Sequence, residues 1–252
     1  MSQKNIRPKE SGAETKEELH LFDHLAELRT RLLHSVLAVM LLSVIAYLWI
    51  QDVMHFFTAP FFSAFPPESL IGTGPAEAFM LKLKVAVFAG LVLASPYIFY
   101  QIWLFVRPGL YQQERRLLLP FVGLTSLLFL IGVAFAYFWV LPFVLQFFLA
   151  EYQSVNVNPA IKLGEHLALV IQLLLCFGLI FEWPVLAFLL GRLRLIQEDT
   201  LVKYWRHAVV AIFIIAAFLT PPDVLSQLMM AGPLLVLYAI SLPIVKFTCK
   251  KT

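Results

Sequence analysis

The chain has 252 residues, of which 60% are hydrophobic and only 14% are charged, and its formal net charge is +3. Soluble domains are about half apolar and a quarter charged, so this chain has more apolar surface than a soluble core of its size can bury. The composition therefore excludes an ordinary soluble domain and predicts an all-α, polytopic membrane protein.

The chain begins with a polar segment. Residues 1–18 are mixed in charge and lack the apolar stretch of a signal peptide, so we expect a disordered cytoplasmic tail. In residues 15–34, apolar side chains recur every three or four positions, while Glu27 and Arg31 lie one turn apart on the opposite face. Two readings stay open: an amphipathic helix lying on the cytoplasmic face of the membrane, or a docking platform that presents carboxylates.

Six apolar stretches follow. Residues 117–150 carry no charge, and a straight helix of that length would measure ~50 Å, well beyond a ~30 Å hydrocarbon core. We therefore expect the third span to end near Pro142 and its continuation to lie outside the core or along the interface. The last two spans are short and would thin the bilayer locally. The expected spans are residues 32–50, 85–106, 117–142, 166–190, 206–220 and 224–243.

The basic residues predict the orientation of these spans. Of the 19 Lys and Arg residues, 16 lie in the N-terminal region, in residues 107–116 and 192–206, and after residue 245. Only three lie in the segments expected on the other side. Because Lys and Arg concentrate in cytoplasmic loops, both termini are expected in the cytoplasm, with an even number of spans.

The connection between the first two spans, residues 58–84, is expected to form a structured outer cap. It contains four prolines, two glycines and several phenylalanines. An ordinary turn-rich loop is the alternative.

Polar residues inside the apolar stretches are the strongest site signals. Glu182 has apolar neighbours on both sides, and a buried carboxylate must be protonated or find a partner. Either it hydrogen-bonds within the bundle, where Pro184 frees the carbonyl of Ile180, or it is a polar spot on a concave, partly wet surface. Asp223, in a Pro-Pro-Asp break, could cap the last helix, and Gln227 needs a hydrogen-bond partner.

Motifs of the common enzyme classes are absent from the sequence. It has no Walker A loop, no His-x-x-x-His zinc pair and no Gly-x-Ser-x-Gly elbow, and its six histidines lack ligand spacing. We therefore expect a protein that is not an enzyme and that uses no cofactor or metal.

The chain resembles the TatC family in four stretches that occur in this order: "HLAELRTRLL", "PYIFYQIWLFVRPGLYQQERR", "FGLIFEWPVL" and "LTPPDVLSQ". Together these motifs are highly specific, and the resemblance extends over about residues 20–245. It implies a six-helix membrane domain over residues 19–245, with a concave bundle and two short C-terminal spans. Residues 246–252 are then a basic cytoplasmic tail.

The resemblance also implies a function that composition cannot give. TatC-like proteins are the core subunits of the twin-arginine protein translocase of the bacterial cytoplasmic (inner) membrane. They recognise signal peptides with a consecutive Arg-Arg motif on folded cargo. They self-associate and assemble with single-span TatA- and TatB-type partners, and the proton-motive force drives export. Nucleic acid is not an expected partner.

Site residues follow from the same resemblance. By motif position, Glu27 and Glu114 match the carboxylates that receive the twin arginines, and Leu25, Arg29 and Phe105 fall in the same recognition surfaces. Carboxylates suit this role because they bind guanidinium groups in fork geometry.

Further positions match residues that act within or across the membrane. Glu182 matches a polar residue inside the concave membrane face, offered to a signal peptide or a partner helix. Gln227 matches a residue that contacts partner spans. Pro60 and Pro96 match prolines of the outer cap and of the second span.

Two other functions compete with this one. A proton- or ion-coupled secondary transporter would use Glu182 as its titrating site. A passive scaffold or assembly factor would not need Glu27 or Glu114 for export.

Overall fold

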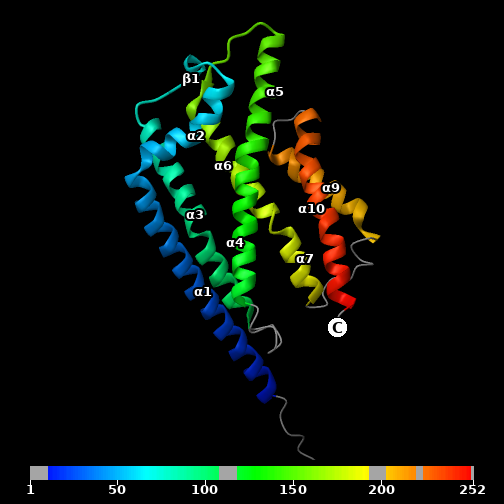
Figure 1. The fold of residues 1–252 in the computed structure, drawn as a ribbon. Coiled ribbons are helices and arrows are strands. Elements are labelled where there is room, and N and C mark those ends of the chain that lie inside the picture. Colours follow the sequence, from blue (N-terminus) through cyan, green and yellow to red (C-terminus); the bar gives the residue numbers. More distant parts are fainter. Residues whose placement is uncertain (1–10, 108–117, 193–202, 220–223, 251–252) are drawn as a thin grey trace, which may run out of the picture.

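The computed structural model describes residues 11–107, 118–192, 203–219 and 224–250, and these are almost entirely helical. Figure 1 shows a bundle of long helices with α2 and the two short strands near its upper end. The elements in chain order are α1 (Ser11–Leu48), α2 (Ile50–Ala64), the 3-10 helix η1 (Pro67–Ser69), β1 (Leu70–Ile71), α3 (Glu77–Val106), α4 (Leu118–Phe135), the π-helical η4 (Ala136–Val140), α5 (Leu141–Ser154), β2 (Ile161–Lys162), α6 (Leu163–Ile180), α7 (Trp183–Arg192), α9 (Trp205–Leu219) and α10 (Val224–Lys250).

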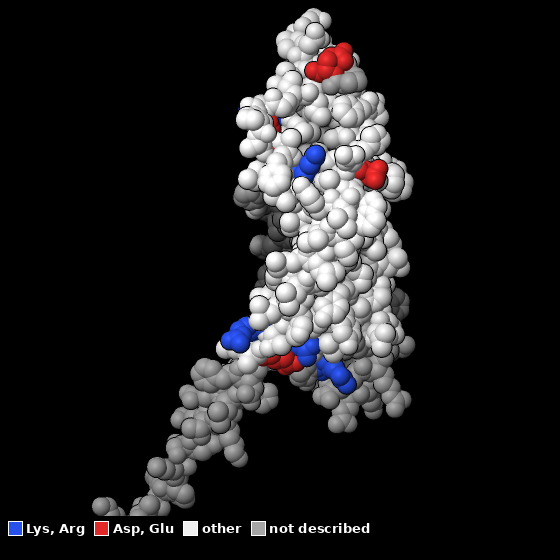
Figure 2. All heavy atoms as spheres, turned by 90° about the vertical axis from the view of Figure 1, so that its left-hand side faces the viewer, with Lys and Arg blue, Asp and Glu red and all other residues white. Residues whose placement is uncertain are grey.

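Six helical rods of the described chain match the six predicted spans. Four of them are long and apolar enough to cross a membrane by length and composition, and two shorter apolar helices follow. On the face shown in Figure 2, acidic and basic side chains lie toward the two ends, and the broad middle of the surface carries none. The apolar segments are His24–Leu48, Glu77–Val106, Leu119–Ser154, Leu163–Gly191, Trp205–Ala217 and Met230–Lys246.

The first helix differs from its predicted form. α1 is one continuous helix of 38 residues, so the segment before the first span is not a separate helix lying on the membrane surface. The sequence explains this, because no glycine or proline occurs from residue 13 to residue 48 to interrupt the helix. α1 begins at Ser11, within the segment expected to be a tail.

The third rod continues past Pro142. The backbone N–H of Leu141 donates to the carbonyl of Ala136, five residues earlier, so the helix widens into a π-helical turn just before the proline. Pro142 has no backbone N–H to donate, and this wider turn lets the helix continue past it. α5 extends the rod to Ser154. The continuation of the helix was predicted, but the rod does not end at Pro142.

The fourth rod is divided in two. α6 ends at Ile180 and α7 begins at Trp183, with Phe181 and Glu182 in the turn between them. Pro184, in the first turn of α7, cannot donate to the carbonyl of Ile180. Pro184 was expected to free the carbonyl of Ile180 within one continuous helix. In the structure it lies at a break between two helices.

The last two helices differ in length. α9 has 15 residues and is short, ~22 Å, as predicted. α10 has 27 residues, because the helix continues beyond the expected end of the span to Lys250 despite Pro233 and Pro243 within it. α10 is therefore a long helix, but its apolar part, Met230–Lys246, is short like that of α9, as the prediction of two short C-terminal spans requires.

The connection after α1 forms the predicted structured cap. α2 is followed by β1, which pairs in parallel with β2 in the register Leu70 to Ile161 and Ile71 to Lys162. The Glu77 carboxylate at the start of α3 accepts hydrogen bonds from the backbone N–H and the hydroxyl of Thr73. These contacts hold the loop between β1 and α3.

Close helix contacts position the rest of the bundle. α1 packs along α3, α3 and α6 both pack on α4, and α7 packs on α10. At Gly90 the backbones of α1 and α3 nearly touch: an added Cβ would lie 2.7 Å from the Cα of Ser43. α1 begins and α10 ends at the lower end of the bundle in Figure 1, as an even number of crossings requires.

Candidate functional site

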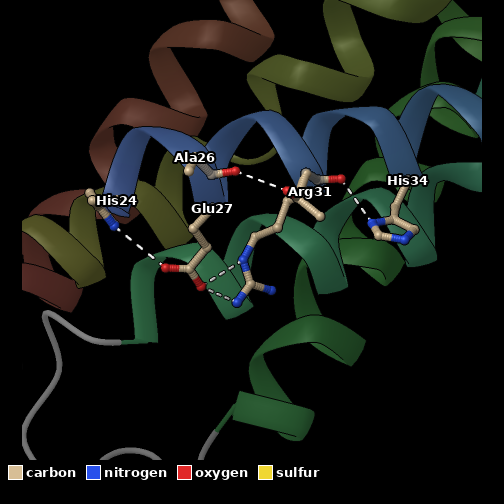
Figure 3. Close-up of polar contacts among 6 residues, drawn as sticks. His24, Ala26, Glu27, Arg31 and His34 are labelled. Atoms are coloured by element: carbon tan, nitrogen blue, oxygen red, sulfur yellow. Dashed lines mark hydrogen bonds and ion pairs between the residues drawn. The ribbon is translucent and has the colours of Figure 1, made fainter. Parts of the chain in front are cut away.

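Glu27, one of the predicted recognition residues, lies on α1 between a histidine and an arginine of the same helix. Its Oε1 atom accepts a hydrogen bond of 2.9 Å from Nε of Arg31 and a second bond from Nη2 of the same guanidinium. Its Oε2 atom lies 3.6 Å from Nδ1 of His24. Helical spacing produces the cluster, because residues three and four positions away share a face with Glu27 (Figure 3).

His24 joins this cluster to α3. Its imidazole stacks on the ring of Phe105 with the ring centroids 4.2 Å apart and the planes 11° apart. Phe105 and Glu27 were both predicted to lie in the recognition surfaces, and the structure brings them together through His24. Sequence reasoning missed this contact because no periodic pattern relates residues on different helices.

A polar groove begins at the cluster and runs between α1 and α3. Its volume is ≈ 440 Å³, and the Glu27 carboxylate lies on its wall. The side chain of Gln101, from α3, is buried in it. The lining residues are Ala26, Glu27, Thr30, Arg31, His34, Tyr97 and Gln101.

Two of the predicted recognition residues lie on another side of α1. Leu25 and Arg29 are exposed, and the side chain of Leu25 is 59% accessible. At 100° per residue they project roughly opposite to Glu27, which faces the groove. The structure therefore does not bring them to the carboxylate.

The second predicted carboxylate, Glu114, lies outside the described residues, between Arg107 and the start of α4 at Leu118. Asp223 lies outside them as well, between α9 and α10. The expectation that Glu27 and Glu114 together receive the two arginines therefore stays a prediction.

Glu182 is enclosed by its own chain. Only 6% of the residue is exposed, and its Oε1 atom is buried without a hydrogen-bond partner in the described part of the chain. The carboxyl lies beside the backbone of Phe129, on α4. The backbone carbonyl of Glu182 accepts the N–H groups of Val185 and Leu186, each at 3.0 Å, at the start of α7. Glu182 thus lies between α4 and the α6–α7 break, not on an open face of the molecule.

Gln227 connects the last two helices. Its Nε2 atom donates a 3.0 Å hydrogen bond to the carbonyl of Phe213, so α10 is tied to α9. The amide in the span does have a hydrogen-bond partner, as its chemistry requires, and that partner belongs to the same chain.

Pro60 and Pro96 lie inside helices, α2 and α3, and each leaves a backbone carbonyl one turn earlier without its helical donor. For Pro96, the hydroxyl of Ser95 donates to the freed carbonyl of Val92 at 2.7 Å. For Pro60, the donor is distant in sequence: the hydroxyl of Tyr137, in η4, donates to the carbonyl of Phe56 at 2.8 Å. The cap and the third rod are therefore joined through Pro60.

Comparisons with known proteins place these residues in context. A family model described as Sec-independent protein translocase protein (TatC) matches residues 23–233. The Sec-independent protein translocase protein TatC of Carboxydothermus hydrogenoformans is 40% identical over 228 residues, 90% of this chain and 93% of that protein. The protein of the same name from Aquifex aeolicus is 34% identical over 92% of this chain and 96% of its own.

The fold has a solved counterpart. A crystal structure described as the twin arginine translocase receptor TatC superposes with a TM-score of 0.81 and 35% sequence identity, over 89% of this chain and 99% of that one. A second crystal structure of the receptor, in DDM, gives a TM-score of 0.80 over 87% of this chain and 97% of that one.

Proposed function

The chain belongs to the TatC family of Sec-independent protein translocase proteins, and on this premise we propose that its α1–α3 groove binds the arginine pair of twin-arginine signal peptides on folded proteins. Membership makes it a membrane-embedded protein translocase component and not an enzyme. The ion-coupled transporter considered above is not favoured, because the relatives and the fold match are translocase proteins.

The observation that supports arginine recognition is the environment of Glu27. Its carboxylate already accepts two donors of one guanidinium, Nε and Nη2 of Arg31, which supports arginine binding at this position. Charge-assisted bonds of this kind are the strong class of hydrogen bonds, and a lysine ammonium cannot reproduce their planar fork. The groove beside the carboxylate offers room for a second guanidinium.

The proposal includes Glu114 as the second acid of a clamp. In the sequence it comes seven residues after Arg107, which directly follows α3, and the last turn of α3 carries Phe105. Leu25 and Arg29, which face away from the groove, are assigned to contacts with the signal peptide or cargo outside the arginine pair.

The proposal also covers partners and orientation. Single-span TatA- and TatB-type proteins and further copies of the chain are the expected partners in a bacterial cytoplasmic membrane, with Gln227 and Glu182 as polar positions inside the spans. Both termini are assigned to the cytoplasm, which is supported by the bias of basic residues and by the return of α10 to the end where α1 begins.

Site-specific photocrosslinking tests the proposal. A crosslinker at position 30, which lines the groove and leaves Glu27 and Glu114 in place, should capture a twin-arginine signal peptide, and the product should disappear when both arginines are lysines. Position 79, an exposed phenylalanine at the far end of the bundle, is a matched control that should give no product. Capture that is insensitive to the lysine exchange would refute arginine recognition at this groove.

A further inference from the structure

We propose that Arg31 is an internal competitor that occupies Glu27 until a signal-peptide arginine replaces it. The inference rests on the proposed function, because it concerns how the same carboxylate is made available. It adds a residue that regulates binding and that touches no part of the peptide in the bound state.

The geometry makes Glu27 unavailable in the resting state. Both donors of Arg31 go to Oε1, and His24 lies beside Oε2 at 3.6 Å. An incoming guanidinium needs two oxygens for a bidentate pair, and one of them is already saturated. The Arg31 side chain is only 21% exposed, so it is held against the protein and is not dispersed in solvent. Figure 3 shows its guanidinium directly against the carboxylate.

Arg31 also has space to withdraw into. It lines the ≈ 440 Å³ groove, and His34 lies one turn further along α1. The polar side chains of Tyr97 and Gln101 lie on the opposite wall. A guanidinium that leaves Glu27 would therefore enter a polar groove and would not be buried without partners.

Competition of this kind has a simple thermodynamic signature. When only a fraction of the molecules has a free carboxylate, the apparent dissociation constant is the intrinsic one divided by that fraction. An i,i+4 ion pair on a helix is closed about twice as often as it is open, so freeing Glu27 should tighten peptide binding about threefold.

The fraction of molecules with a free Glu27 carboxylate scales the apparent affinity of every cationic ligand equally. Arg31 therefore does not change the ratio between twin-arginine and twin-lysine affinities, but it weakens both, so that only the stronger ligand binds at a given concentration. A direct contact between Arg31 and the peptide would have the opposite effect, because its removal would weaken binding. A role in helix stability alone would leave affinity unchanged.

The test measures binding of a fluorescent twin-arginine signal peptide, and of its twin-lysine variant, to the purified full-length chain in lipid nanodiscs. Arg31→Gln should lower both dissociation constants by the same factor, about threefold. Arg31→Lys keeps the charge but loses the fork, so it should give a smaller gain. Arg107→Gln is the control: it removes an exposed positive charge at the C-terminal end of α3, the end that carries Phe105, and it should change affinity less than twofold.

The double variant Glu27→Gln/Arg31→Gln shows where the gain arises. It should bind no more tightly than Glu27→Gln alone, because without the carboxylate there is nothing to compete for. Equal gains in Arg31→Gln and Arg107→Gln would overturn the inference, since general charge repulsion would then explain both. The inference would also be overturned if Arg31→Gln bound the peptide no more tightly than the wild type, while Glu27→Gln bound it more weakly. If Glu27→Gln has no effect at all, the recognition site itself is wrong, and the inference falls with it.

Discussion

The hydroxyl of Tyr137 satisfies a carbonyl that Pro60 leaves free, and its removal tests how the cap after α1 is held. Tyr137→Phe keeps the ring, which stacks on Phe56 with centroids 4.1 Å apart, and deletes only the donor. The carbonyl of Phe56 then has neither the hydroxyl nor a helical N–H, because residue 60 is proline.

The expected loss of stability follows from the cost of an orphaned acceptor. Such a group costs about 1–3 kcal/mol in a protein interior, and interhelical hydrogen bonds in membranes contribute roughly 0.6–1.7 kcal/mol. Tyr137 is buried, so we expect a loss of about 1–2 kcal/mol. For a chain of this size, that lowers the melting temperature by roughly 2–8 °C.

A double-mutant cycle in detergent, followed by thermal unfolding, tests this explanation. Pro60→Ala restores an N–H one turn after Phe56, so the helix itself can satisfy the carbonyl. In the Pro60→Ala background, Tyr137→Phe should therefore cost about 1 kcal/mol less than in the wild type. An equal cost in both backgrounds would refute the link between the hydroxyl and the freed carbonyl.

Three further predictions follow from features of the bundle. Gly90→Ala should destabilise the protein by about 1–3 kcal/mol, because the new Cβ meets the backbone of Ser43 and separates α1 from α3. Gly123→Ala is the control: its Cβ meets nothing within 4 Å, so it should be neutral or slightly stabilising. Equal melting temperatures for the two variants would contradict this prediction. Glu182→Gln should retain export of a twin-arginine reporter far better than Glu182→Leu, because an amide keeps a polar group that can hydrogen-bond at this buried position; equal export by both variants would count against a polar requirement. Four leucines inserted into α9 should reduce export if its short length thins the bilayer, and normal export at normal protein levels would remove that explanation.

The spans could be predicted from the sequence because lipid demands uninterrupted apolar helices. Each of the six expected segments falls on an apolar helix of the structure, and the all-α fold is confirmed by the match to solved translocase receptors. Boundaries set by local backbone chemistry were less predictable. The π-helical turn before Pro142 and the break at Glu182 depend on which carbonyl a proline leaves free and on what else can satisfy it.

Site contacts divide in the same way. The Glu27–Arg31 pair could be anticipated, because helical spacing alone brings the two side chains together. The stacking of His24 on Phe105 and the bond from Tyr137 to Phe56 could not, since they join residues on different helices. The enclosure of Glu182 was also beyond reach: a carboxyl in an apolar run shows that it needs a partner, but not whether that partner lies inside the chain or outside it.

The cap after α1 depends on contacts with residues that are synthesised long after it. Tyr137 follows Phe56 by 81 residues, and His166, whose ring nitrogen lies 3.3 Å from the carbonyl of Phe57, follows it by 109. β1 likewise cannot pair until β2, which directly precedes α6, has been synthesised. Contacts so distant in sequence form late, so the emerging chain must insert α1, α2 and α3 with the cap still open. A chain truncated before residue 137 would leave the carbonyl of Phe56 without the Tyr137 hydroxyl, and any chain truncated before residue 161 would leave the β1 edge unpaired. Unfinished molecules therefore differ from complete ones at this cap.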